Sequence, residues 1–157
     1  MPSKKIHSPE DPKYRLDNSP FYLMAHADHK YHFDLDMVLE QRGMSLSIYR
    51  IMTVLAEHQP ASISTISNLA IIKRSTVSRI VERMTDCDLV TTQPAEEDGR
   101  ITEVSLTPVG TSKLKDLTPI IARQFSRAIR DIDEVELANA VVTIRKIVSN
   151  LSKSPIE

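Results

Sequence analysis

Residues 73–84, KRSTVSRIVERM, restrict the fold more than any other segment because their apolar and polar side chains separate onto two sides of one helix. The apolar positions recur at intervals of three and four, which is helical spacing: Val77, Ile80, Val81 and Met84. The opposite side carries hydroxyl and guanidinium groups, which bind phosphates and base edges. The pattern fits either a helix that lies in a DNA major groove or an ordinary solvated helix.

The residues after this helix favour a β-hairpin. Residues 89–93 (LVTTQ) are rich in strand-forming side chains, and residues 101–106 (ITEVSL) alternate between apolar and polar. Between them lies a polar turn, PAEEDGR, that ends at Arg100. A helix followed directly by a hairpin with an arginine at its tip is the layout of a winged helix-turn-helix. In that layout Arg100 would reach a minor groove, where narrow A·T-rich DNA concentrates negative potential.

Composition agrees with a mainly α fold that carries a small β-hairpin wing. The chain has 157 residues, of which 41% are apolar and 26% charged, with only 3 Gly, 3 Phe and no Trp. The formal net charge is −1. A nucleic-acid contact therefore requires a local cationic patch. Residues 73–83 supply one, because they hold four cations and a single acid, Glu82: Lys73, Arg74, Arg79 and Arg83.

Helix-start and helix-stop signals divide the rest of the first half. Ser19-Pro20 predicts a helix from about residue 20 to residue 42, closed by Gly43. Ser45 or Ser47 caps a second helix that ends at Pro60. Residues 61–63 are expected to be extended, and Ser64 is expected to cap a third helix with Ile66 and Ala70 inward. Three prolines, Pro2, Pro9 and Pro12, precede Ser19, so residues 1–18 are predicted to be a flexible extension.

The C-terminal part is predicted to be helical and to provide a dimer interface. One helix starts at Thr107-Pro108 and continues towards residue 130, with Pro119 kinking or interrupting it. Asp131 or Asp133 caps the last helix. That helix carries an apolar stripe at steps of four and three: Leu137, Val141, Ile144, Val148 and Leu151. A two-fold dimer would bury the stripe, so residues 19–44 and 108–153 are assigned to dimerisation and residues 45–107 to DNA binding.

Several function classes are disfavoured by what the sequence lacks. It contains no phosphate-cradling Gly-rich loop, no G-x-S-x-G and no metalloprotease signature, so neither catalytic residues nor a cofactor are expected. A single cysteine, Cys87, excludes an intrachain disulfide. The N-terminus has no apolar core after its lysines, and no apolar run is long enough to span a bilayer. A cytoplasmic protein without a membrane partner is expected.

The strongest motif lies in the wing. Residues 97–100 (EDGR) followed by residues 106–110 (LTPVG), with RSTVSR ahead of them, resemble the multiple antibiotic resistance regulator (MarR) family of bacterial transcription factors. The resemblance covers about residues 20–151. It implies a homodimer that binds a palindromic double-stranded operator, with recognition helices in successive major grooves and wings in the flanking minor grooves. It also implies a repressor that a small-molecule effector releases.

The resemblance assigns roles to individual residues. The groove-facing half of the recognition helix would consist of Arg74, Ser75, Thr76, Ser78 and Arg79. Arg100 would be the wing arginine, and Asp98 would hold an arginine in place by an ion pair. Two positions depart from the family pattern. Ile71 stands where a glycine is frequent, which predicts a turn of non-glycine geometry, and Lys73 replaces an acidic cap.

The family places effectors, often aromatic acids or phenolic compounds, between the dimerisation and DNA-binding parts. The residues predicted to line such a pocket come from the first helix, the loop after it and the second helix: His29, Phe33, Met44, Tyr49 and Met52. Each of them is equally typical of core packing. The pocket assignment therefore stays open between these two interpretations.

Three other interpretations compete with the main hypothesis. His26 and His29 are neighbours on a helix and could share a metal, although a polar helix face is the simpler explanation. Cys87 could sense oxidants, but it is expected to pack under the wing as a small buried group. A helical protein-interaction adaptor would explain the apolar stripe. It would not explain a cationic recognition face.

Overall fold

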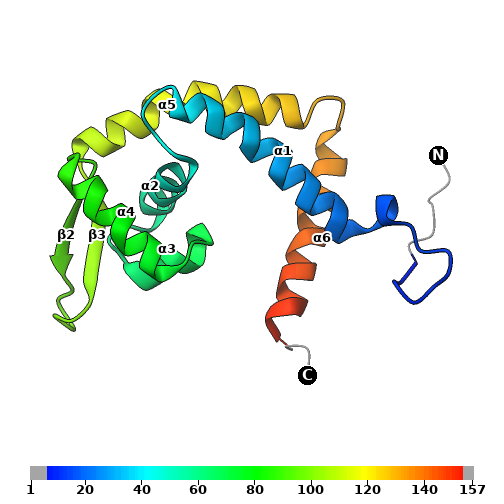
Figure 1. Ribbon diagram of the computed structural model, residues 1–157, viewed down its shortest axis with the longest axis horizontal. Coiled ribbons are helices and arrows are strands. Elements are labelled where there is room, and N and C mark those ends of the chain that lie inside the picture. The colour runs from blue at the N-terminus through cyan, green and yellow to red at the C-terminus, as the bar shows by residue number, and fades with distance from the viewer. Residues whose placement is uncertain (1–6, 154–157) are drawn as a thin grey trace. The chain divides into compact units, whose positions relative to one another are not determined.

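The computed structural model describes residues 7–153. Within them the chain forms six α-helices, one short 3-10 helix and three strands, so the predicted mainly α class with a small β wing is confirmed (Figure 1). The chain divides into two compact units, one ending at Pro119 and the other beginning at Ile120. Among the described residues no helix combines the length and apolarity needed to cross a membrane.

The first long helix begins at the proline that the sequence indicated. Helix α1 (Pro20–Glu40) has Pro20 in its first turn, buries Leu35 and Leu39, and ends slightly before the predicted residue 42. Gly43 then adopts φ +68°, a left-handed conformation that favours glycine. A single 3-10 turn, η1 (Leu16–Asn18), precedes the helix and lies within the extension expected to be irregular. Residues 1–6 of that extension lie outside the described residues.

Helices α2 (Leu46–His58), α3 (Ile63–Ala70) and α4 (Arg74–Asp86) form the body of residues 45–107, the segment predicted to bind DNA. The Oγ of Ser45 caps α2 by accepting a hydrogen bond from the Ile48 N–H at 3.3 Å. The expected cap of α3 was wrong: Ser62, not Ser64, accepts from the Thr65 N–H at 3.1 Å. Ser62 has the extended backbone that a cap requires because it ends a strand.

The core of the segment from α2 onward lies where these three helices meet the three-stranded sheet that is described next. Its members are fully buried apolar side chains at helical or alternating positions: Ile51, Leu55, Ile66, Val77 and Val104. Ala70 is also buried, as expected, and Val81 and Met84 complete the inner face of α4. The apolar side of the 73–84 segment therefore anchors α4 and leaves its polar side outward.

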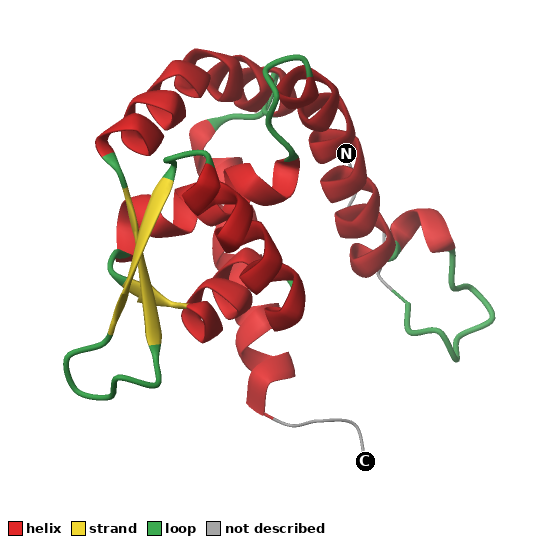
Figure 2. Ribbon diagram, turned by 60° about the vertical axis from the view of Figure 1, so that its left-hand side comes forward, coloured by secondary structure: helices red, strands yellow, loops and turns green. Residues whose placement is uncertain are grey.

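The hairpin is present and gains a third strand. Strands β2 (Val90–Pro94) and β3 (Thr102–Leu106) pair antiparallel with Val90 opposite Leu106 and Pro94 opposite Thr102. Strand β1 (Ala61–Ser62) pairs with the other edge of β3, which gives the order β1-β3-β2. Residues 61–63 were expected to be extended, but this pairing was not predicted. Figure 2 shows the loop between β2 and β3 extending away from the helices.

The residue that follows the hairpin is hydrogen-bonded to the residues that follow α4. The Thr107 N–H donates to the Leu89 carbonyl at 3.1 Å, and the Thr107 hydroxyl donates to the Asp88 carbonyl. The same hydroxyl oxygen accepts from the Gly110 N–H at 2.9 Å, in the first turn of α5 (Pro108–Ala128). A Cβ at Gly110 would lie 2.0 Å from the Leu89 carbonyl oxygen. The LTPVG motif therefore has a steric basis.

Helix α5 continues through Pro119, so the helix is not interrupted there, while the other expectation, a kink at Pro119, stays a prediction. Asp133, rather than Asp131, caps the final helix α6 (Glu134–Lys153): its carboxylate accepts from the Glu136 N–H at 2.8 Å, and the Glu136 carboxylate accepts from the Asp133 N–H at 3.4 Å. Along α6 most of the apolar stripe is exposed, and Leu137 is half-buried. Val148 is 58% exposed and Leu151 64%.

Candidate nucleic-acid interface

Helix α4 presents its cationic and hydroxyl side chains to solvent because its opposite face is anchored in the core. The exposed members of this recognition face are Arg74, Ser75, Thr76, Arg79 and Arg83. Ser78 is half-buried, and its hydroxyl donates to the Arg74 carbonyl at 3.2 Å. Lys73, which is also exposed, is the N-cap residue and makes no side-chain capping bond. The recognition face is therefore free to meet an anionic surface.

The turn before α4 differs from the prediction. Ile71 adopts φ 56° and ψ 48°, so the turn uses left-handed, glycine-like geometry with an isoleucine in place. This conformation costs an L-residue about 1–2 kcal/mol. Ser67 holds the turn, because its carbonyl accepts from both the Ile71 and Ile72 N–H groups and its hydroxyl donates to the Ile72 carbonyl at 2.7 Å. The prediction failed because these bonds outweigh the local preference of isoleucine.

The wing tip is shaped by Asp98. Its carboxylate accepts a hydrogen bond from the Arg100 N–H at 3.0 Å, and its carbonyl accepts from the Ile101 N–H at 2.9 Å. The contact is with the main chain instead of the ion pair expected of Asp98. This turn leaves the Arg100 side chain exposed at the tip. The arginine is thus positioned through its backbone.

A cleft of about 390 Å³ lies where the start of α3, the recognition helix and the wing converge. It is lined by hydroxyl, guanidinium and a few apolar groups: Ser62, Ile63, Ser64, Arg74, Ser78, Arg100, Ile101 and Thr102. The structure thereby brings Arg74, Ser78 and Arg100, predicted separately, to one opening. Sequence analysis missed Ser62, Ser64 and Thr102 as lining residues. The serine-rich start of α3 was the available signal.

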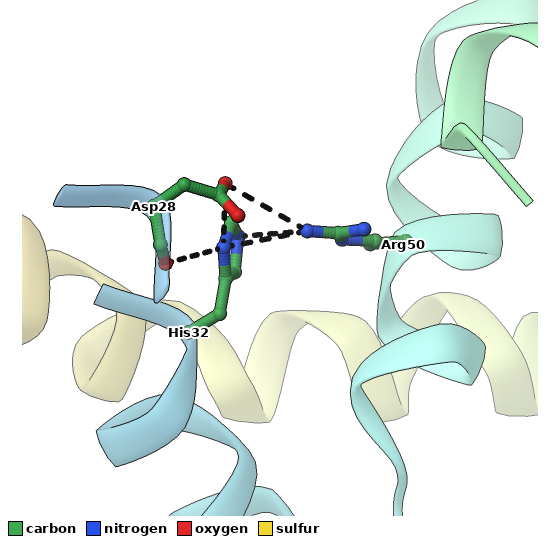
Figure 3. A network of polar contacts seen from close by, with 3 residues as sticks. All are labelled: Asp28, His32 and Arg50. Atoms are coloured by element: carbon green, nitrogen blue, oxygen red, sulfur yellow. Dashed lines mark hydrogen bonds and ion pairs between the residues drawn. The ribbon is translucent and has the colours of Figure 1, made fainter. Parts of the chain in front are cut away.

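A second polar site connects α1 to α2 (Figure 3). The His32 Nδ1 lies 2.9 Å from the Asp28 Oδ1, and the Arg50 guanidinium lies 3.3 Å from the His32 Nδ1. Arg50 also lies 4.0 Å from the Asp28 carboxylate, which keeps 65% of its side chain exposed. This α1–α2 cluster of Asp28, His32 and Arg50 pairs one carboxylate with an arginine and an imidazole.

Two phenols belong to the same pair of helices. Burial, and then the neighbouring Tyr31, raise the pKa of the Tyr49 phenol, while burial raises the pKa of Tyr31. Both groups are therefore neutral at physiological pH and retain an O–H that can donate a hydrogen bond. Tyr31 also packs edge-on against the His32 ring, with ring centroids 5.2 Å apart.

The five residues predicted to line an effector pocket have different surroundings. Met44 and Met52 are buried in the core, with 2% and 0% of their surfaces exposed. Phe33 is 57% exposed and stacks obliquely on His29 with ring centroids 5.9 Å apart. Tyr49 is half-buried. Arg50 and His32, whose side chains could bind an ionic ligand, were not selected from the sequence.

Two side interpretations can be compared with the structure. Cys87 is exposed, so the expectation that it packs under the wing was wrong. It follows α4 as the C-cap residue, and a helix end lies outside the packed layer. Within residues 7–153 no group of three or more His, Cys, Asp or Glu side chains is placed to hold a metal ion. His26 instead stacks on Tyr22, with ring centroids 4.2 Å apart.

Comparisons with known proteins agree with this geometry. A sequence model described as the MarR family matches residues 42–101, which span α2 to the wing. The HTH-type transcriptional repressor IacR of Pseudomonas putida is 31% identical over 153 residues, covering 96% of this chain and 92% of its own. The chain belongs to the MarR family. It is therefore a transcription regulator and not an enzyme.

Solved structures of the MarR family share the fold. A transcriptional regulator from Silicibacter pomeroyi superposes with a TM-score of 0.82 at 24% identity, covering 90% of this chain and 96% of that one. BpsR of Bordetella bronchiseptica, whose DNA binding is regulated by 6-hydroxynicotinic acid, superposes with a TM-score of 0.75 at 17% identity. That match covers 86% of this chain and 96% of BpsR.

Proposed function

We propose that this MarR-family chain is a homodimeric transcriptional repressor that binds palindromic operator DNA and is released by a small-molecule effector. The observation that carries the proposal is the cleft in which Arg74 and Arg100, from the recognition helix and the wing, open to one side. Guanidinium groups on separate elements repel each other. Their convergence is favourable where an anionic backbone lies between them.

The residues divide by the part of DNA that each would contact. The N-terminal half of α4 would enter the major groove, where Arg74, Ser75, Thr76, Ser78 and Arg79 could reach base edges and flanking phosphates. Arg100 would enter the adjoining minor groove. Lys73 and Arg83 lie at the two ends of the recognition face and would neutralise phosphates. Asp98 supports the wing turn instead of touching DNA.

The dimer is supported by the apolar side chains of α6. Val141, Ile144, Val148 and Leu151 are each more than 40% exposed in the single chain. A soluble monomer rarely keeps a contiguous apolar stripe exposed, and a second copy is the simplest partner that would cover it. A dimer also matches the two half-sites of a palindrome.

The effector proposal rests on the α1–α2 cluster and on relatives. The DNA binding of BpsR is regulated by an aromatic acid, 6-hydroxynicotinic acid. In this chain Arg50 lies 4.0 Å from the exposed Asp28 carboxylate, which a ligand carboxylate could replace. Tyr49 from α2, and His29 and Phe33 from α1, would supply ring contacts. Met44 and Met52, which are buried in the core, would shape the floor.

The test first selects duplexes that bind the wild-type protein from a random pool. Fluorescence anisotropy then measures the affinity of wild type and variants for these duplexes. We expect Arg100→Ala and Arg79→Ala each to weaken binding by about 1–3 kcal/mol, and affinity to fall steeply with salt. Arg15→Ala is the matched control, because this exposed arginine precedes α1 and lies outside the recognition face. Unchanged affinity in both variants, or a flat salt dependence, would remove the assignment.

A further inference from the structure

The most exposed large apolar side chain in residues 7–153 lies at the edge of the proposed DNA surface. Ile71 is 85% exposed, and it stands two residues before Lys73, the N-cap of the recognition helix. Successive Cα atoms are about 3.8 Å apart, so Ile71 lies within about 8 Å of that cap. The feature does not belong to the packed core or to the α6 stripe.

The backbone holds this side chain outward in a costly conformation. The Ile71 and Ile72 N–H groups both bond to the Ser67 carbonyl, which fixes the left-handed turn from two sides. Glycine adopts this conformation freely, whereas a β-branched residue there is a true outlier. Strained residues of this kind concentrate at functional sites. Neither burial nor packing within the chain accounts for an isoleucine at this point.

We propose that Ile71 is a specificity-determining residue that contacts the methyl group of a thymine in each operator half-site. The inference rests on the proposed function. In a helix-turn-helix the start of the recognition helix enters the major groove, so the turn before it lies at the groove edge. Of the groups exposed on base-pair edges there, the thymine C5-methyl is the apolar one. A side chain without donors or acceptors can read that group and no other.

The experiment removes the methyl group from the DNA and the side chain from the protein. Each thymine of the selected duplex is replaced in turn by uracil, which keeps the hydrogen-bonding edge and lacks the methyl. Wild type is expected to lose affinity about fourfold at one thymine per half-site, the effect of one buried methyl group. Ile71→Gly and Ile71→Asn, which suit a left-handed turn, should show no loss at that position. Ile71→Val should keep most of it.

Controls separate this inference from the proposed function. Leu69→Ala removes another exposed apolar side chain, 48% exposed and two residues away, and should retain the wild-type uracil pattern. Circular dichroism melting should show Ile71→Gly at least as stable as wild type, so lost discrimination would not reflect unfolding. Equal uracil losses in wild type and Ile71→Gly would overturn the thymine contact alone. A wild-type protein that selects no duplex would overturn both.

Discussion

At the residue scale, Gly110 has a steric role that its helical position does not suggest. Glycine in a helix is normally about 1 kcal/mol less favourable than alanine. Here a Cβ would lie 2.0 Å from the Leu89 carbonyl oxygen, which belongs to the backbone and cannot turn aside. The close approach keeps α5 against the end of α4. Helix propensity and steric fit therefore make opposite predictions at this position.

Gly110→Ala is expected to lower the free energy of unfolding by about 1–3 kcal/mol, the usual cost of overpacking. The measurement is urea denaturation followed by circular dichroism. Gly99→Ala is the control, because a Cβ at Gly99 in the wing loop meets nothing within 4 Å, and it should change stability by less than about 0.5 kcal/mol. A more stable Gly110→Ala variant would show that propensity dominates.

Ile71→Gly is expected to change stability in the opposite direction from Gly110→Ala. Removing the side chain should relieve left-handed strain and raise the free energy of unfolding by about 1 kcal/mol. The same denaturation experiment measures it. Leu69→Gly, inside α3, should instead lose about 1 kcal/mol. If both substitutions destabilise equally, Ile71 is not strained.

Residue-level rules succeeded where spacing alone decides the outcome. The inward positions Val77, Val81 and Met84 follow from helical periodicity and are buried. The rules failed where hydrogen bonding in a turn, or the position of a residue at a helix end, decides the outcome. Ser67 sets the conformation of Ile71, and the end of α4 leaves Cys87 exposed.

At the element scale, the α1–α2 cluster connects α1, which is predicted to take part in dimerisation, to α2, the first helix of the predicted DNA-binding part. Arg50 and His32 are 18 residues apart in sequence and 3.3 Å apart in space. Their separation along the chain explains why this contact could not be predicted from local sequence patterns. The hairpin could be predicted, since its alternation is local. The pairing of β1 could not, because a strand of two residues carries no periodicity.

Arg50→Ala is expected to separate effector response from DNA binding. A charged hydrogen bond is worth about 1.5–3 kcal/mol, so the aromatic acid concentration that half-releases the operator should rise at least about tenfold. Operator affinity without effector should change by less than about threefold. The measurement is anisotropy with an aromatic acid chosen by thermal shift, starting from 6-hydroxynicotinic acid. Arg50→Lys tests whether charge alone suffices, and an unaltered response in Arg50→Ala would place the effector elsewhere.

At the scale of the whole molecule, a net charge of −1 means that DNA affinity depends on how charge is distributed. The recognition face concentrates cations, whereas the wing adds one arginine, Arg100, beside the acids Glu96, Glu97 and Asp98. Two copies of such a surface would double the number of neutralised phosphates. Assembly and affinity are therefore expected to change together.

Ile144→Lys combined with Val148→Lys is expected to convert the protein to a monomer, because two charges would have to be buried in the α6 interface. Sedimentation equilibrium measures the change, and operator affinity should fall with it. Both positions are exposed in the single chain, at 43% and 58%, so the protomer should remain folded. Asn139→Lys, at an exposed polar position of the same helix, is the control. A dimer that survives both lysines would assign the interface to other helices.

The hydrogen bonds of Thr107 to Leu89 and Asp88 have a consequence for the length of DNA that one protomer would contact. They join the base of the hairpin to the residues directly after α4, so main-chain geometry sets the separation between Arg74 on α4 and Arg100 on the wing before DNA binds. Substitutions of Arg74 or Arg100 should then change the affinity for DNA. The number of base pairs in a half-site should stay the same.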